Sequence, residues 1–257
     1  MKIEKIKKLS NGKYKIQLEN KEVITTYDEV ILNENILFKK EIDNELLNKI
    51  NNQNDYYKIY NKTLKYIMTK IRSEKEINIY LDKQNVEKID KEKIIKKLKD
   101  NHMLNDKTYL KAFIADKVRL SSDGKEKIKK QLLEQNIDSK LIDEELEKYD
   151  EEIKEKLEKL INKKIKTYYK YSEYIAKQKI KEYFINLGYK IDEIDEVLNK
   201  IKIENTDSIK KEYEKQYNKL SKKYKDKELE YKLKNTLYQK GYKIDEINKI
   251  MWYNYPR

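Results

Sequence analysis

The heptapeptide Gly-Tyr-Lys-Ile-Asp-Glu-Ile occupies residues 188–194 and occurs again, unchanged, at residues 241–247. Apolar residues upstream match at the same offset: Ala176, Ile180 and Phe184 against Leu229, Leu233 and Leu237. Moving toward the N-terminus by similar offsets brings in two further copies, one with Ile128, Leu132, Asn136 and Ile137 and one with Ile77, Leu81, Asn85 and Val86. Four copies at such a period are typical of a tandem helical array.

Each copy is predicted to hold three helices. In the first copy the leading helix has an apolar stripe made of Tyr60, Leu64, Ile67 and Ile71. Ser73 and Glu76 then have the spacing of a capping box, which would start the second helix. Asp90 is the predicted N-cap of the third helix.

The second helix of each copy should end in a left-handed residue. Gly188 and Gly241 stand at that place in the two C-terminal copies, and glycine adopts the left-handed backbone without steric cost. Asn85 and Asn136 hold the same place in the earlier copies, and asparagine is the next best residue there.

Residues before the first copy read differently. Tyr14–Leu18 alternates apolar and polar residues after Asn11-Gly12, a strong hairpin signal, and Val23–Tyr27 is a second β-branched run. We expect a sheet of two or three strands, followed by a short helix near Asp43–Ile50. Because so small a sheet is marginal alone, it must pack on the rest of the chain.

The predicted fold is therefore mostly α: about four three-helix repeats forming an elongated, curved solenoid, with a small N-terminal β segment. With only four Gly and one Pro in 257 residues, the composition also favours helices. The predicted segments are an N-terminal one and four repeats: 1–52, 53–104, 105–152, 153–204 and 205–257.

Several classes of site are excluded by composition. The chain has no Cys and a single His, His102, so thiol nucleophiles, zinc sites made of cysteines and multi-histidine metal sites are ruled out. His102 follows the last helix of a repeat and is predicted to be a surface or boundary residue. Paired carboxylates such as Asp192 and Glu193 recur at helix starts, which indicates capping and not acid–base catalysis. We expect no enzyme activity and no cofactor.

The chain is expected to act in the cytoplasm and away from membranes. No apolar stretch is long enough to cross a bilayer, and charges occupy the N-terminus where a signal peptide needs its apolar part.

The chain has a net charge of +13, but the second repeat, residues 105–152, is acidic. Alternating basic and acidic repeats suit a protein partner or protein-coated nucleic acid. Residues 163–171 and 217–225 interleave Lys and Tyr, a pattern that can follow phosphates and stack on bases. In the alternative interpretation, which we favour, Tyr217, Leu220 and Tyr224 are core residues and the lysines form a solvated face. Frequent Lys, Ile and Asn also fit an AT-rich genome.

The first two repeats resemble the RecX family of recombination regulators. The resemblance rests on Arg72-Ser73-Glu74-x-Glu76-Ile77, on Leu104-Asn105-Asp106-x-x-Tyr109-x-x-Ala112-Phe113 and on Gly124-x-x-x-Ile128-x-x-x-Leu132-x-x-x-Asn136-Ile137. The N-terminal strands and the four-repeat length resemble the longer members of that family. The chain departs from the family pattern at Leu110, Ala115, Lys125 and Asn136; at 115 the family usually has Arg, although Lys117 and Arg119 lie nearby.

The resemblance implies a helical protein without catalytic residues that binds the recombinase RecA. Such proteins lie in the groove of the filament that RecA forms on single-stranded DNA and limit its growth, its ATPase and its strand-exchange and coprotease activities. We expect the chain to be a monomer that contacts the filament, with single-stranded DNA as a further partner.

The candidate partner contacts combine that resemblance with residue chemistry. Arg72 and Arg119 are the only arginines within the repeats, and arginine offers a bidentate fork that lysine lacks. The full set is Arg72, Tyr109, Lys117, Arg119, Lys163, Lys164, Lys166 and Lys170. Two alternatives stay open: a helical nucleic-acid-binding protein that acts without RecA, and a scaffold that binds a protein and ignores DNA.

Overall fold

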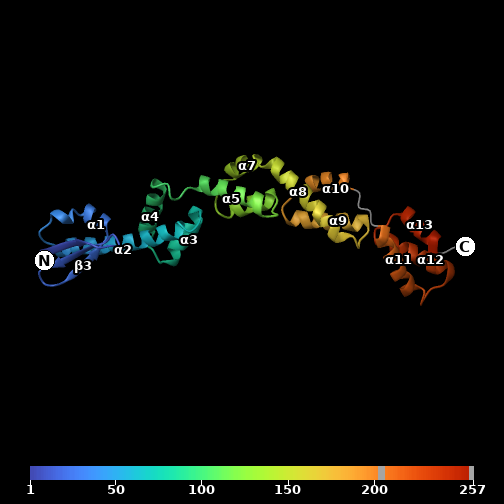
Figure 1. The fold of residues 1–257 in the computed structure, drawn as a ribbon, viewed down its shortest axis with the longest axis horizontal. Helices are drawn as coiled ribbons and strands as arrows, with labels where there is room; N and C mark the ends of the chain where they lie inside the picture. The colour runs from blue at the N-terminus through green and yellow to red at the C-terminus, as the bar shows by residue number, and fades with distance from the viewer. Residues whose placement is uncertain (202–205, 255–257) are drawn as a thin grey trace. The chain divides into compact units, whose positions relative to one another are not determined.

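Helices in groups of three follow a small N-terminal sheet along the chain (Figure 1). The computed structural model describes residues 1–201 and 206–254. The described chain divides into two compact units, Met1–Tyr109 and Leu110–Arg257. The first unit opens with β1 (Ile3–Lys8), β2 (Tyr14–Leu18), β3 (Val23–Thr26), α1 (Asp28–Asn33) and the short 3-10 helix η1 (Ile36–Phe38).

Four helical groups follow, which we call repeats one to four. They are α2 (Asn44–Ile67), α3 (Glu74–Lys83) and α4 (Lys88–Asp100); α5 (Asp106–Leu120), α6 (Lys125–Leu133) and α7 (Ser139–Glu147); α8 (Asp150–Ile165), with the 3-10 helix η2 (Lys166–Tyr168), α9 (Glu173–Asn186) and α10 (Ile191–Lys200); and α11 (Thr206–Leu220), α12 (Asp226–Gln239) and α13 (Ile244–Asn254). The prediction of four three-helix repeats behind a small β segment is confirmed.

The N-terminal sheet has the predicted hairpin. Its three strands are antiparallel in the order β1-β2-β3, and Ile16 lies opposite Ile6 on one side and Ile24 on the other. Gly12 turns the chain between β1 and β2 with a φ of 80°, which explains why glycine stands there. Ile16 and Leu18 are fully buried in one core that extends to Leu104, so the sheet packs on repeat one as expected.

A helix does begin after Asp43, as predicted, but the prediction that it is short is wrong, because one continuous helix, α2, runs from residue 44 to residue 67. The Asp43 side chain caps it by accepting a 2.7 Å hydrogen bond from the backbone N–H of Leu46. No Gly or Pro interrupts the segment, so the helix that packs on the sheet continues as the leading helix of repeat one. The proposed segment boundary at 52/53 consequently falls inside α2, while the one at 204/205 lies outside the described residues.

Two further expectations for repeat one need correction and one is confirmed. Ile71 does not belong to the leading stripe, because α2 ends before it and its side chain is exposed. Asp90 is not an N-cap, since α4 begins two residues earlier with Glu87 at the cap position. The Ser73 capping box is present: Glu76 N–H donates to Ser73 Oγ, and Ser73 N–H donates to Glu76 Oε2, each at 3.1 Å.

The four helix corners predicted from the repeat are confirmed. Asn85, Asn136, Gly188 and Gly241 have φ values of 54°, 62°, 86° and 77°. The hydrogen bonds around them are also the same: in repeat three, Tyr189 N–H donates to Phe184 O and Gly188 N–H to Ile185 O, and the other three repeats have the corresponding pairs. This is the Schellman arrangement, which satisfies carbonyls that the helix end leaves free.

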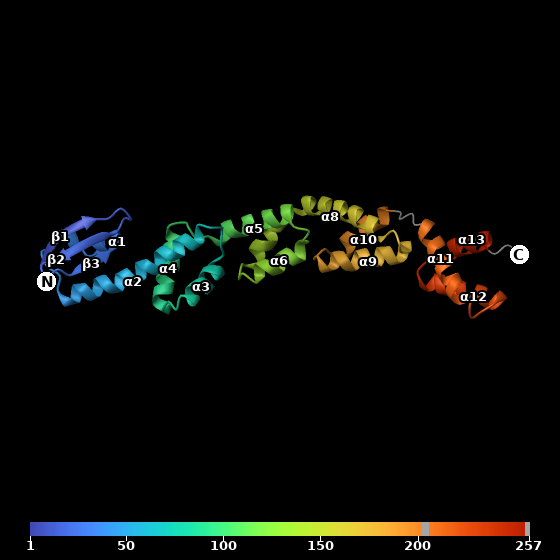
Figure 2. The ribbon, with the colours of Figure 1, turned by 60° about the horizontal axis from the view of Figure 1, so that its bottom comes forward.

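In the second unit, the second helices of successive repeats meet end to end (Figure 2). At the junction of repeats two and three, Gly124 N–H donates to Leu187 O at 2.6 Å and Glu126 N–H donates to Gly188 O at 3.0 Å. At the junction of repeats three and four, the Ser172 hydroxyl donates to Lys240 O at 2.7 Å. The N-terminal end of α6 is thus hydrogen-bonded to the C-terminal end of α9, and the N-terminal end of α9 to the C-terminal end of α12.

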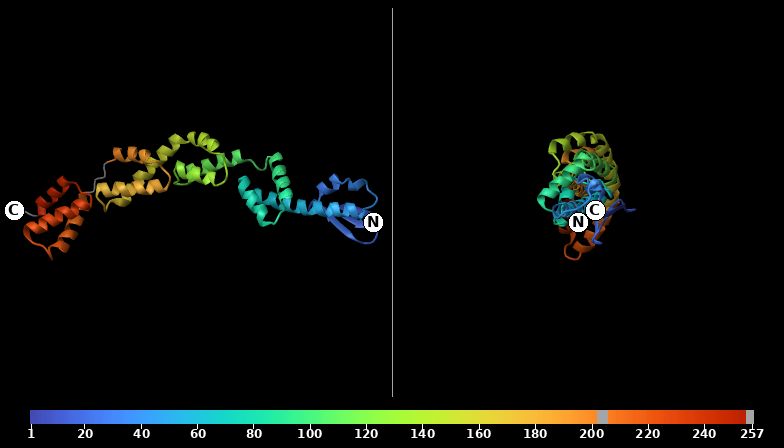
Figure 3. Two further views of the ribbon diagram at one scale, coloured as in Figure 1. Left: turned by 180° about the vertical axis from the view of Figure 1, so that it is seen from behind. Right: turned by 90° about the vertical axis from the view of Figure 1, so that its left-hand side faces the viewer.

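The three helices of repeat four lie together at the red end of the ribbon (Figure 3), and they enclose one apolar cluster. These helices bury Ile209, Tyr213, Leu229, Leu233, Leu237, Tyr242, Ile247, Ile250 and Met251.

Among the described residues, no helix is both long and apolar enough to cross a membrane.

Candidate partner-binding surface

Three of the lysines predicted to contact a partner are exposed near the end of α8. Lys163 is in the last turn of α8, Lys166 begins η2, and Lys170 lies in the turn that leads to α9. Buried Ile161 holds this end of α8 against the repeat. None of the three lysines forms an ion pair with a described residue, although many other lysines of the chain do. We call Lys163, Lys166 and Lys170 the repeat-three basic surface.

Lys164, the fourth predicted lysine of this stretch, has an internal role. Its amine lies 3.8 Å from the centre of the Tyr183 ring on α9 and 5.7 Å from that of Tyr168. A lysine over an aromatic face is stabilised by the charge distribution of the ring. Lys164 is half-buried and ties α8 to α9, so the structure does not place it with the three exposed lysines.

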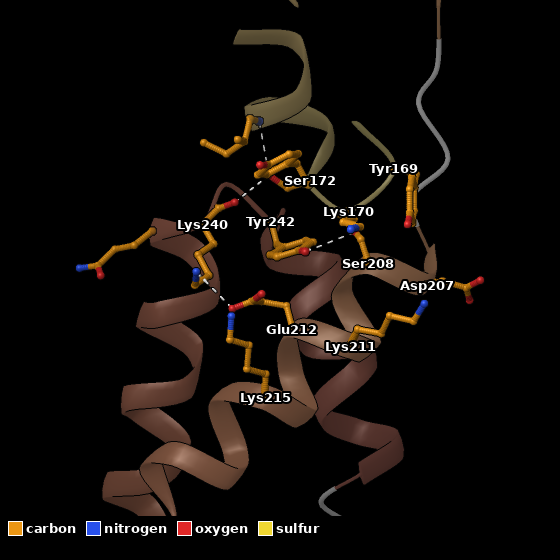
Figure 4. Close-up of a pocket in the computed structure, with 13 residues that line it drawn as sticks. Tyr169, Lys170, Ser172, Asp207, Ser208, Lys211, Glu212, Lys215, Lys240 and Tyr242 are labelled. Carbon is orange, nitrogen blue, oxygen red and sulfur yellow. Dashed lines mark hydrogen bonds and ion pairs between the residues drawn. The ribbon is translucent and has the colours of Figure 1, made fainter. Parts of the chain in front are cut away.

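A pocket of about 620 Å³ opens beside this stretch, between repeats three and four (Figure 4). Repeat three contributes residues 169–172 and repeat four contributes α11 and the end of α12. The lining residues are Tyr169, Lys170, Tyr171, Ser172, Ile175, Asp207, Ser208, Lys211, Glu212, Lys215, Gln239, Lys240 and Tyr242. Among them are four lysines, two carboxylates and three tyrosines, so the pocket is basic and partly aromatic.

One lysine of the pocket forms an ion pair, and the other three form none with a described residue. Lys240 Nζ lies 3.1 Å from Glu212 Oε1, and Gln216 also donates to that carboxylate at 2.7 Å. Burial opposes ionisation of Glu212, but these hydrogen bonds and the nearby Lys240 and Lys215 charges outweigh it and hold its pKa below the usual value. Lys170, Lys211 and Lys215 form no ion pair with a described residue.

The base of the pocket is held by hydroxyl groups. Tyr242 Oη donates to Ser208 Oγ at 3.3 Å, which joins the start of α11 to the corner after α12. Burial raises the pKa of the Tyr242 hydroxyl, and the hydrogen bond with Ser208 opposes this only in part. Ser172 caps α9 while donating to Lys240 O, and it thereby fixes the position of Lys240 next to Glu212.

Arg72 is engaged by its own neighbours. Its guanidinium lies 3.5 Å from the centre of the Tyr66 ring and donates to Tyr66 O, Tyr66 Oη and Thr69 Oγ1 at 2.9–3.0 Å. Its side chain is only 11% exposed and also lies 3.6 Å from Glu76. The structure therefore gives Arg72 a role in holding the turn between α2 and α3.

The three candidates on α5 differ in how far a partner can reach them. Tyr109 is buried, and burial raises the pKa of its hydroxyl to about 12. Lys117 is half-buried, 3.4 Å from Asp123, with its amine near the Phe113 ring. Arg119 is exposed and only 3.9 Å from exposed Glu152, a kind of pair that contributes little energy. Of these three, Arg119 is the one presented to solvent.

The pocket lysines of repeat four were missed by sequence reasoning. Lys211 and Lys215 are four residues apart and so lie on one face of α11, but this spacing is common in so lysine-rich a chain. The Lys- and Tyr-rich pattern that the sequence does show in this repeat lies at residues 217–225. There Tyr217, Leu220 and Tyr224 pack against the core of repeat four, which confirms the core interpretation of that stretch.

The described residues show no arrangement suited to metal chemistry. No group of three or more His, Asp or Glu side chains among them is placed to hold a metal ion. His102 is exposed, with a φ of 55°, just after α4, which confirms it as a boundary residue. The recurring acidic pairs cap helices as expected: Glu193 accepts from Lys190 N–H at 3.1 Å, and Glu246 from Lys243 N–H at 2.9 Å.

Solved structures share this fold. A crystal structure of regulatory protein RecX superposes with a TM-score of 0.69 at 22% sequence identity, covering 77% of this chain and 98% of the other. The crystal structure of RecX from Lactobacillus salivarius superposes with a TM-score of 0.53 at 28% identity, covering 57% of this chain and 96% of the other.

The sequence is similar to RecX proteins over most of its length. Residues 203–251 match the family model for the third three-helix domain of RecX. The regulatory protein RecX of Oceanobacillus iheyensis is 32% identical over 87% of this chain and 85% of its own length. That of Streptococcus agalactiae serotype III is 31% identical over 97% of both chains. These relatives and the shared three-helix repeats show that the chain belongs to the RecX family of regulatory proteins.

Proposed function

We propose that this protein regulates RecA by binding the filament that RecA forms on single-stranded DNA. Its effect is inhibitory: it limits filament assembly, ATP hydrolysis and the recombinase and coprotease activities. It acts in the cytoplasm, as a monomer and without catalysis of its own. The observation that carries the proposal is the repeat-three basic surface in a chain of the RecX family, because its lysines have no carboxylate partners within the described structure.

Uncompensated lysines favour a partner with negative charge. A nucleoprotein filament carries DNA phosphates, and positive charges opposite them steer association and release bound counterions. Arg119 offers a further exposed cation in repeat two. Tandem repeats add weak contacts in series, and linked contacts multiply affinity without any single dominant residue.

The test is ATP hydrolysis by RecA of the same organism, assembled on single-stranded DNA before the protein is added. The proposal predicts slower hydrolysis, at protein concentrations well below that of RecA if filament ends are the target. Unchanged hydrolysis with correctly folded wild-type protein contradicts the proposal. Filament length measured in the same samples separates loss of RecA from the DNA from inhibition in place.

Binding measurements separate this function from the alternatives. The proposal predicts tighter binding to RecA-coated DNA than to bare single-stranded DNA. Equal binding to both would favour a nucleic-acid-binding protein that acts without RecA, which the lysines and tyrosines of the pocket in Figure 4 would also suit. Binding to neither would favour a scaffold for a different protein.

A further inference from the structure

The pocket between repeats three and four combines cations with an exposed aromatic ring. Lys170 reaches it from repeat three, and Lys211 and Lys215 reach it from one face of α11. Tyr169 lies at its edge with 56% of its surface exposed (Figure 4). Cations beside an exposed ring are the two elements with which proteins hold a phosphate and stack on the base attached to it.

We propose that this pocket binds the phosphate group of a nucleotide, which is either free or one unit of a single strand. Lys170, Lys211 and Lys215 supply the charge, and Tyr169 supplies a stacking face for the base. The volume of about 620 Å³ lies in the range of small-molecule sites. This site goes beyond regulation of RecA, because its ligand is recognised by the chain alone.

The internal ion pair explains why the charge is available. Glu212 Oε1 lies 3.1 Å from Lys240 Nζ and also accepts a 2.7 Å hydrogen bond from Gln216 Nε2. Lys211 and Lys215 extend from the same helix as Glu212 without an ion pair of their own among the described residues. A phosphate would therefore meet Lys170 and Lys211, which have no paired carboxylate among the described residues, and Lys215, whose charge acts on Glu212 without forming an ion pair.

Asp207 offers a substitution that should strengthen phosphate binding, in contrast to the lysine substitutions, which should weaken it. It is exposed and lines the rim near the start of α11, where Figure 4 shows it at the edge of the group. Its negative charge repels a phosphate, so neutralising it should tighten binding. Loss of Lys211 or Lys215 should weaken binding, and all three side chains are exposed, so their replacement leaves the core intact.

The experiment measures binding of ATP, inorganic triphosphate and a short oligothymidylate to the full chain, with no RecA present. The Lys211→Gln/Lys215→Gln variant should bind at least one of these about tenfold more weakly per lysine removed, as expected for hydrogen bonds between charged groups. Asp207→Asn should bind more tightly. Tyr169→Leu should weaken binding of ATP or oligothymidylate several-fold and leave triphosphate unchanged.

The control is Lys222→Gln/Lys223→Gln, which removes the same charge from exposed lysines of repeat four outside the pocket. It should change binding less than twofold under the same salt conditions. Binding of ATP identifies a free nucleotide as a ligand, and binding of oligothymidylate alone identifies a strand. The proposal is overturned if none of the three probes binds, or if control and pocket variants lose affinity equally. Because RecA is absent, this result is independent of the ATPase test.

Discussion

The two junctions of the second unit use the same helix ending in different surroundings. Gly188 ends α9 and Gly241 ends α12, both inside the repeated heptapeptide. At the junction of repeats two and three, Gly188 meets the backbone around Gly124, and a Cβ on Gly124 would lie 2.5 Å from the carbonyl of Gly188. At the junction of repeats three and four, a Cβ on Gly241 would meet the side chains of Ser172 and Tyr174 at 2.9 Å.

This difference shows that the same motif can end a helix against backbone or against side chains. Backbone against backbone cannot adjust, so the junction of repeats two and three is fixed. It also partly buries Lys156, whose amine donates to Asp123 O at 3.0 Å and whose pKa is lowered by that partial burial. Side chains against a corner can move, and beside them the junction of repeats three and four keeps the basic pocket.

The largest expected effect is that of Gly124→Ala. Gly124 has an ordinary extended backbone, so the whole loss of stability comes from the clash of the new Cβ with Gly188. The backbone segments around Gly124 and Gly188 would have to move apart. We expect a loss of about 3 kcal/mol in the free energy of unfolding, as for overpacked sites. Gly241→Ala should cost only about 1–2 kcal/mol, chiefly for its left-handed backbone.

Urea unfolding followed by circular dichroism measures both variants. If Gly241→Ala proves as costly as Gly124→Ala, the two junctions are equally rigid and the distinction between them fails. If Gly124→Ala is nearly neutral, the backbone contact contributes nothing to stability.

A smaller effect is expected from the acidic residue at each junction. Asp123 is buried and accepts from Lys127 at 2.7 Å and Lys117 at 3.4 Å, while Glu173 accepts from Lys177 and Lys243 at 2.9–3.0 Å. Burial works against the charge of Asp123, but the two lysines outweigh it and hold its pKa below the ordinary 3.8. At neutral pH, Asp123→Asn should cost about 1–2 kcal/mol, and Glu173→Gln, with exposed Lys243 as a partner, less than about 1 kcal/mol.

The pH dependence of this effect has a definite sign. Because the folded pKa of Asp123 is lowered, its contribution is complete above 3.8 and is lost as the pH falls through the folded value. The difference in unfolding free energy between wild type and Asp123→Asn should therefore shrink below pH 3.8. A difference that stays constant down to acid pH would show that the charge of Asp123 is not what stabilises the junction.

The smallest effects should come from the equivalent tyrosines of the heptapeptide. Tyr189 Oη is buried with no hydrogen-bond partner among the described residues, whereas Tyr242 Oη donates to Ser208. Tyr189→Phe should leave stability unchanged or raise it by up to about 1 kcal/mol, and Tyr242→Phe should lower it by about 1 kcal/mol. Equal losses in thermal unfolding would mean that the two hydroxyls have equivalent surroundings.

The sequence predicts what depends on local geometry. The left-handed corners follow from Gly or Asn at matched positions, and the capping box follows from the spacing of Ser73 and Glu76. The length of α2 was not predictable in this way, because two helical patterns without a breaker between them can form either one helix or two. The position of a helix start is uncertain by one or two residues when it is predicted from sequence. Asp90, predicted as the N-cap, lies instead in the first turn of α4.

The candidate site depends on contacts between distant residues, which a single sequence does not reveal. The rarity of arginine pointed to Arg72 as a partner contact, yet the chain folds back so that Tyr66 takes the guanidinium. The pocket joins Lys170 to Lys211 across two repeats, and only packing brings them together. The repeat-three lysines were found because they are clustered in sequence, and their exposure leaves them as candidates.

Affinity for RecA assembled on single-stranded DNA tests most directly whether the exposed lysines of repeat three contact the filament. Lys163→Gln/Lys166→Gln/Lys170→Gln should be compared with Lys111→Gln/Lys130→Gln/Lys140→Gln, which removes the same charge from exposed lysines of repeat two. At one fixed salt concentration, the first variant should bind at least about tenfold more weakly than wild type, and the second should lose much less. Equal losses, or none in either variant, would contradict the assignment of filament binding to this surface.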